Sequence, residues 1–160
     1  MKRLLALLLA LAMMLSLFGC GAAVSEDPGY VPEGMQTQPG ETEELPDEDG
    51  WYYSAEEVAL YLVTYGCLPE NFITKNEARE LGWEGGSVED YAPGYAIGGD
   101  RFGNREGLLP KADGRQYYEC DIDTLGKDSR GAKRIVFSND GLIYYTGDHY
   151  ESFILLYGEE

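Results

Sequence analysis

The segment KRIVFSNDGLIYYTGDHY, residues 133–150, decides the fold class of this chain. Residues 134–138 and 142–146 are rich in β-branched and aromatic side chains, which are typical of strands. Asn139, Asp140 and Gly141 stand between them, and such residues tolerate the backbone angles of tight hairpin loops. The segment therefore predicts a β-hairpin.

Outward from the hairpin, residues 116–122 and 153–156 predict two more strands. Earlier in the chain, SAEE at 54–57 and TKNE at 74–77 have the form of capping boxes. Apolar residues at helical spacing follow each box as far as Gly66 and Gly82, and a short third helix is expected to open at Ser87. Helices followed by strands indicate an α+β fold, with N-terminal helices packed on a C-terminal antiparallel sheet.

The first twenty residues have the pattern of a lipoprotein-type signal peptide. Lys2 and Arg3 precede an apolar run over 4–18, and the run ends in Gly19 and Cys20 as a lipidation motif does. We therefore expect export, with Cys20 as the lipidation site. Plain secretion and an uncleaved anchor are the alternatives, although the run is short of the roughly 20 residues that a spanning helix needs.

Residues 21–50 are expected to form a disordered tether. They hold nine acidic residues and no basic one, are rich in Gly and Pro, and show no apolar period. The folded domain is expected over 51–160. Export would also permit a disulfide between Cys67 and Cys120, and the sequence leaves a bridge and two free thiols equally open.

The charge is strongly acidic. The chain has a formal net charge of -17, and residues 51–160 hold 20 acidic and 10 basic side chains, a net of -10. Such a field repels nucleic acid at long range, so binding of RNA requires a local basic cluster. Basic residues gather in one short stretch, at Lys127, Arg130, Lys133 and Arg134.

Several segments in sequence order resemble the barnase-like family of microbial guanyl-preferring ribonucleases. They are LPENFITKNEARELGW (68–83), APGYAIGGDRFGNREGLLP (92–110), GRQYYECDID (114–123) and RGAKRIVFSNDGLIYYTGDHY (130–150). The resemblance covers essentially all of 51–160. It implies the microbial ribonuclease fold and a metal-independent endoribonuclease with no cofactor. Such an enzyme cuts single-stranded RNA after guanine to a 2′,3′-cyclic phosphate, which it then hydrolyses.

The resemblance also implies catalytic roles. Glu119 matches the general base and His149, the only histidine, matches the general acid. Lys75, Arg130 and Arg134 match the cations around the scissile phosphate. These residue types suit the chemistry, because a carboxylate and an imidazole can divide the proton transfers while cations stabilise the charged phosphorane.

Strand alternation adds a detail to this site. It places Glu119 and Asp121 on one face of a strand, and Asp121 is expected to pair with an arginine. The stretch between Glu119 and Arg134 is one residue longer than the family pattern. Lys127 or Lys133 could therefore take the place of Arg130, and the sequence leaves this open.

Guanine recognition is expected in the loop that begins at Phe102. A guanine edge offers two adjacent donors, N1–H and N2–H2, which the Glu106 carboxylate could accept together. Asn104 is expected to hold the loop in shape and Arg105 to contact phosphate. Tyr150 is expected to stack on a nucleoside.

Two other classes of function compete with the enzyme. One is a surface-displayed binding domain that kept the fold and lost turnover, against which the presence of both Glu119 and His149 argues. The other is a lipoprotein substrate-binding or adhesion module, which only the signal and tether favour. For the enzyme we expect a monomer that is secreted or lipid-anchored outside the cell, and a barstar-like inhibitor protein as a partner.

Overall fold

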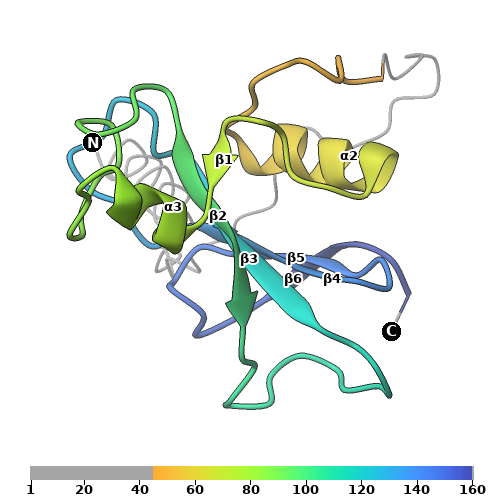
Figure 1. Cartoon of the computed structure of the whole chain (residues 1–160). Coiled ribbons are helices and arrows are strands. Elements are labelled where there is room, and N and C mark those ends of the chain that lie inside the picture. Colours follow the sequence, from red (N-terminus) through yellow and green to blue (C-terminus); the bar gives the residue numbers. More distant parts are fainter. Residues whose placement is uncertain (1–44, 160) are drawn as a thin grey trace, which may run out of the picture.

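The computed structural model describes residues 45–159 (Figure 1). Within this range the elements are α2 (Ala55–Tyr65), β1 (Phe72–Ile73), α3 (Lys75–Glu80), β2 (Ala96–Phe102), β3 (Tyr117–Asp121), β4 (Arg134–Ser138), β5 (Ile143–Thr146) and β6 (Ile154–Tyr157). The strands form one sheet in the order β1-β2-β3-β4-β5-β6. All neighbours are antiparallel except β1 and β2, which are parallel. The predicted α+β class is confirmed.

The predicted hairpin joins β4 to β5. The Ser138 N–H donates to the Leu142 carbonyl over 2.8 Å, and the Gly141 N–H donates back to the Ser138 carbonyl over 3.3 Å. Gly141 has φ 100°, a left-handed angle that glycine adopts without strain. The turn residues thus act as the sequence indicated.

Both predicted capping boxes form. At α2, the Ser54 hydroxyl accepts from the Glu57 N–H, and the Glu57 carboxylate accepts from the Ser54 N–H. Gly66 ends this helix in the left-handed conformation, φ 71°. At α3, Thr74 and Glu77 repeat the same exchange.

Replacing Ser54 with alanine should therefore destabilise the fold by about 1 kcal/mol, the usual cost of removing an N-cap oxygen. The measurement is urea denaturation of the two proteins, where the midpoint should fall with the slope unchanged. Glu57→Gln keeps an acceptor for the reciprocal bond and is the control. An unchanged midpoint in the Ser54 variant would contradict this account of the helix start.

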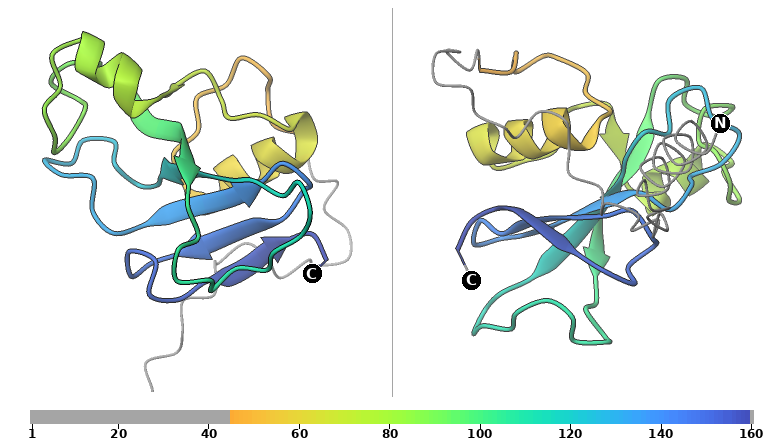
Figure 2. Two further views of the ribbon diagram at one scale, coloured as in Figure 1. Left: turned by 60° about the horizontal axis from the view of Figure 1, so that its bottom comes forward. Right: turned by 180° about the vertical axis from the view of Figure 1, so that it is seen from behind.

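Helix α2 lies across one face of the sheet, and the segment joining β2 to β3 lies on the opposite side (Figures 1 and 2). The apolar face of the helix meets alternate residues of the strands. This core contains Ala55, Val58, Ala59, Leu62, Cys120, Ile122, Ile135, Ile143 and Tyr145, all at most 5% exposed. A second cluster joins α3 to β2, and a third covers the sheet face away from α2.

The sequence predicted that the folded domain begins near Trp51. In the structure the folded region begins before this residue. The hydroxyls of Tyr61 and Tyr65 donate to the carbonyls of Glu48 and Pro46, over 2.9 and 2.6 Å. Hydrogen bonds therefore hold residues 46–50 against α2, and this part of the predicted tether belongs to the folded region. The signal peptide, Cys20 and the tether up to residue 44 lie outside the described residues. Within 45–159, no helix has the length and apolar character needed to cross a membrane.

One other expectation was wrong. No helix opens at Ser87; instead the Val88 carbonyl accepts from the N–H groups of Tyr91 and Ala92, which makes turns. Of the two states that the sequence left open for Cys67 and Cys120, the structure shows two free thiols. Cys67 is exposed beyond the end of α2, whereas Cys120 faces the core, where burial raises its thiol pKa.

Strand β2 was not anticipated, because its Gly-Gly-Asp sequence is typical of a loop. The register of β2 with β3 shifts between Gly98 and Asp100, which is a β-bulge. A Cβ on Gly98 would lie 2.7 Å from Cβ of Cys120 and from Cδ1 of Phe72, so only glycine permits this close approach. Gly99 takes φ 88° within the bulge.

Candidate active site

The candidate site lies on the sheet face away from α2. Side chains alternate along β3, so Cys120 faces the helix while Tyr117 packs in the apolar cluster of the opposite face. Glu119 and Asp121 share that opposite face, as strand alternation predicted. Each of them makes charged contacts there.

Glu119 is 8% exposed and engages both of its carboxylate oxygens. Oε1 accepts from Nζ of Lys75 over 2.5 Å, and Oε2 accepts from the Tyr150 hydroxyl over 2.6 Å. These partners lie 44 and 31 residues away along the chain. The fold thus brings three of the predicted site residues into direct contact.

Lys75 reaches Glu119 because its helix is anchored to β2. The Lys75 N–H donates to Oδ2 of Asp100 over 2.8 Å, which satisfies a free amide at the start of α3. Asp100 follows the bulge in β2. Asp100 was not predicted as a site residue, although it lies within 92–110, a segment that resembles the family.

Tyr150 is held as a hydrogen-bond donor. Burial and the contact with Glu119 both raise the pKa of its phenol far above the usual value, so the hydroxyl stays protonated at neutral pH. Its ring stacks on Phe102 with centroids 5.2 Å apart. The sequence had suggested only stacking for Tyr150, and the hydroxyl contact is a finding of the structure.

Asp121 pairs with two arginines. Nε and Nη2 of Arg130 donate to its two oxygens over 2.6 and 2.8 Å. Nε of Arg134 lies 2.9 Å from Oδ1, a contact that is an ion pair rather than an aligned hydrogen bond. Asp121 and Arg134 are each 2% exposed. The buried carboxylate therefore fixes both cations.

The residue of this loop that pairs with Asp121 is Arg130 and not a nearby lysine. Lys133 instead pairs with Asp123 over 2.7 Å, outside the Asp121 cluster. The guanidinium of Arg130 also lies over the Trp83 ring, 5.8 Å from its centroid. Burial works against the charged form of Arg130, but the bond and charge of Asp121 prevail and raise its pKa.

His149 lies beside Tyr150, with ring centroids 4.8 Å apart. It is exposed and its backbone is left-handed, φ 60°, an angle that His, Asn and Asp tolerate better than other non-glycine residues. Its N–H donates to the Ala132 carbonyl over 3.2 Å. That bond places the histidine next to the loop that carries Arg130 and leads into β4, where Arg134 lies.

Asp148 holds the turn that presents His149. Its carboxylate accepts from the hydroxyl and N–H of Ser152, the N–H of Glu151 and the hydroxyl of Thr146. The bonds from Ser152 are the main cause that lowers its pKa to about 2. No role for Asp148 was predicted from the sequence, although it lies within 130–150, a segment that resembles the family.

The loop after β2 is fixed by Asn104. This residue has φ 42°, and its side chain exchanges two hydrogen bonds with the backbone of Leu109, over 2.8 and 3.1 Å. Arg105 and Glu106 are exposed at the tip. The loop is therefore rigid at its base and presents charged side chains to solvent.

The site brings together a carboxylate, an imidazole and three cations, a set that can take a proton from a hydroxyl, give one to a leaving oxygen and stabilise the charge added to a phosphodiester. Over residues 45–159, no three His, Cys, Asp or Glu side chains are grouped so that they could hold a metal ion. Of the five predicted catalytic residues, Glu119 lies on β3, Arg134 on the neighbouring β4 and Lys75 at the start of α3, while Arg130 and His149 lie in the loops before β4 and after β5.

Comparison with known proteins gives a consistent result. A family model described as ribonuclease matches residues 55–157. A ribonuclease from Heyndrickxia coagulans is 51% identical over 98 residues, which cover 60% of this chain and 89% of that protein. A ribonuclease from Bacillus intermedius is also 51% identical over 98 residues, 60% of each protein. Guanyl-specific ribonuclease Sa3 from Kitasatospora aureofaciens is 38% identical over 96 residues, 59% of this chain and 62% of that protein.

Proposed function

The chain belongs to the ribonuclease family, and from this premise we propose that it cuts single-stranded RNA on the 3′ side of guanine without a metal ion or other cofactor. The observation that supports this best is the environment of Glu119. A buried carboxylate that touches one ammonium and one phenol, on the same face as two fixed arginines, suits a base acting beside a phosphate.

In the proposed mechanism Glu119 takes the proton from the ribose 2′-hydroxyl. The freed oxygen attacks the phosphorus, and His149 protonates the departing 5′-oxygen. The product is a 2′,3′-cyclic phosphate, which water opens with the two proton roles exchanged. Each Glu119 oxygen accepts one bond, from Lys75 or from Tyr150, and keeps a second lone pair with which it can accept the hydroxyl.

The cations divide the electrostatic work. Arg134 donates from Nη1 and Nη2 to the carbonyls of Arg130, Lys133 and Gly131, so it acts as a fixed charge. Arg130 uses Nε and Nη2 for Asp121 and leaves Nη1 for a phosphate oxygen. The ammonium of Lys75 lies beside Glu119, the proposed general base. Such charges need little reorganisation as the phosphorane forms.

Guanine specificity is proposed to rest on Glu106. Its exposed carboxylate accepts from N1–H and N2–H2, while amides of the loop that Asn104 holds donate to O6. Arg105 contacts a phosphate and Tyr150 a nucleoside. The carboxylate distinguishes guanine from adenine, because adenine lacks both donors.

Glu106→Gln should lower kcat/KM for cleavage after guanine by about tenfold or more, since a good bidentate contact is worth about 1–3 kcal/mol of discrimination. Cleavage after adenine should stay nearly unchanged. The measurement is kcat/KM on short RNAs that differ only in the base before the cut. Glu84→Gln, an exposed glutamate in another loop, is the charge-matched control. Equal losses after both bases would remove Glu106 from recognition.

The remaining parts of the proposal rest on the sequence. The proposed protein is extracellular. It is exported through residues 1–20 and is either secreted or held at the outer face of the cell membrane by a lipid on Cys20, with a tether before the domain. A monomer is expected. A barstar-like inhibitor would present acidic groups to Lys75, Arg130 and His149, because the maker of an active ribonuclease needs protection before export.

A further inference from the structure

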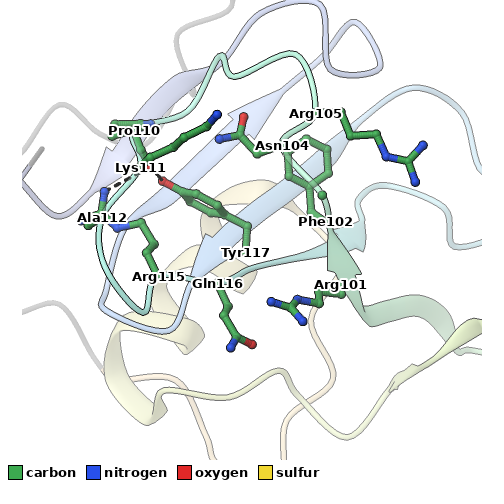
Figure 3. Close-up of a pocket in the computed structure, with 11 residues that line it drawn as sticks. Arg101, Phe102, Asn104, Arg105, Pro110, Lys111, Ala112, Arg115, Gln116 and Tyr117 are labelled. Atoms are coloured by element: carbon green, nitrogen blue, oxygen red, sulfur yellow. Dashed lines mark hydrogen bonds between the residues drawn. The ribbon is translucent and has the colours of Figure 1, made fainter.

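A cavity of about 590 Å³ lies at the end of β2, outside the predicted catalytic residues (Figure 3). Its walls come from the end of β2, the loop that follows it and the start of β3. Its lining includes Arg101, Phe102, Arg105, Lys111, Arg115 and Tyr117.

Its charge is opposite to that of the domain. Residues 51–160 have twice as many acidic as basic side chains, yet four cations and no acid line the cavity. Arg115 is compensated by Asp140 at 2.8 Å. Arg101, Arg105 and Lys111 are exposed, and none forms an ion pair within the described part of the chain. Three positive charges are therefore free to meet an anion.

The cavity is also preformed. The buried Tyr117 donates its hydroxyl to the Pro110 carbonyl over 2.7 Å, and Arg115 reaches the same carbonyl over 3.4 Å. Asn104 closes the other end of the loop through Leu109. The backbone beneath the cations is thus tied to β3, so an anion that binds there need not order the loop.

The position of the cavity indicates which anion it would take. Phe102 and Arg105 belong both to its lining and to the proposed guanine loop, and Phe102 stacks on Tyr150 of the catalytic face. A single strand held by its guanine at this loop therefore passes close to the cavity. The other two unpaired cations are Arg101, just before the proposed guanine loop, and Lys111, after it. Both lie outside the residues that would hold the guanine base.

We propose that this cavity binds a backbone phosphate of the RNA substrate outside the two nucleotides that flank the cut. The inference rests on the proposed function and adds a binding site for longer RNA. It explains how an acidic domain can retain a polyanion, because screening over about 8 Å at physiological salt separates the local cations from acids elsewhere. Single-strand binding of this kind is expected to depend on salt.

The test compares Arg101→Gln/Lys111→Gln with the unchanged protein on two substrates, a guanosine-containing dinucleotide and a longer single-stranded RNA with one guanine. A slope of about 0.7 per lost phosphate contact corresponds to about a fourfold loss of affinity at 0.15 M salt. We therefore expect KM for the longer RNA to rise about fourfold or more, with kcat unchanged, and a shallower salt dependence. Cleavage of the dinucleotide should be unaffected.

Arg79→Gln, which removes one exposed cation on α3, is the control for loss of a positive charge outside the cavity. An equal effect of this control, or equal effects of the double variant on both substrates, would overturn the phosphate site. An unchanged KM for the longer RNA would overturn it too. If the unchanged protein cleaved neither substrate, the proposed function would fail instead, so the two failures are distinguishable. Thermal melting checks that the variants are folded.

Discussion

Replacing His149 with asparagine is expected to slow RNA cleavage by about 10²–10⁴-fold, the usual contribution of a positioned acid or base. Asparagine is the sharper choice over alanine, because the left-handed backbone at this position, φ 60°, suits asparagine. The turn held by Asp148 should therefore persist, and the loss should come from the missing proton donor. The measurement is kcat/KM on an RNA with one guanine.

A second substrate separates acid catalysis from a structural effect. A guanosine 3′-phosphate ester with an acidic aryl alcohol as leaving group needs little protonation as it departs. The His149→Asn variant should cleave this ester nearly as well as the unchanged protein does. Equal losses on the RNA and on the aryl ester would mean that His149 positions the substrate and is not the acid.

Asp121→Ala should destabilise the fold by about 3–5 kcal/mol, the cost of leaving a buried charge without its partner. Arg134 is 2% exposed, and Asp121 is the only carboxylate paired with it among residues 45–159. Arg130 loses both of its aligned bonds as well. Urea denaturation measures the change in unfolding free energy.

A neighbouring ion pair supplies the matched control. Asp123 pairs with Lys133, but the two side chains are 39% and 44% exposed, so Asp123→Asn should cost less than about 1 kcal/mol. Asparagine also tolerates the left-handed angle at this position, φ 58°. If both variants lost the same small amount, Asp121 would not be the centre of a buried charge cluster.

The elements that the sequence predicted are those encoded locally. A capping box lies within four residues, and the Asn139–Gly141 turn specifies its hairpin without reference to the rest of the chain. Strand β2 escaped prediction because a bulge interrupts its alternation and glycines occupy its centre. Its stability comes from pairing with β3, which local propensity does not report.

In the candidate site too, the features that local sequence encodes were predicted and those that depend on long-range contacts were not. Residue types and the resemblance pointed to Glu119 and His149, and alternation predicted the face that Glu119 shares with Asp121. The contacts of Glu119 with Lys75 and Tyr150 join segments 44 and 31 residues apart, and no local pattern encodes them. The anchoring of α3 by Asp100 is equally non-local. The pairing of Asp121 with Arg130, and of Asp123 with Lys133, likewise needed coordinates.

The most direct test of the central claim is to map the ends produced when the purified protein cuts a single-stranded RNA in excess EDTA, beside the His149→Asn variant. The account predicts cuts predominantly after guanine, ending in 2′,3′-cyclic phosphate, and nearly absent in the variant. Cuts that persist unchanged in the variant, or that need a divalent cation, would contradict it. Folded protein with no cleavage at all would favour a binding domain that has lost turnover.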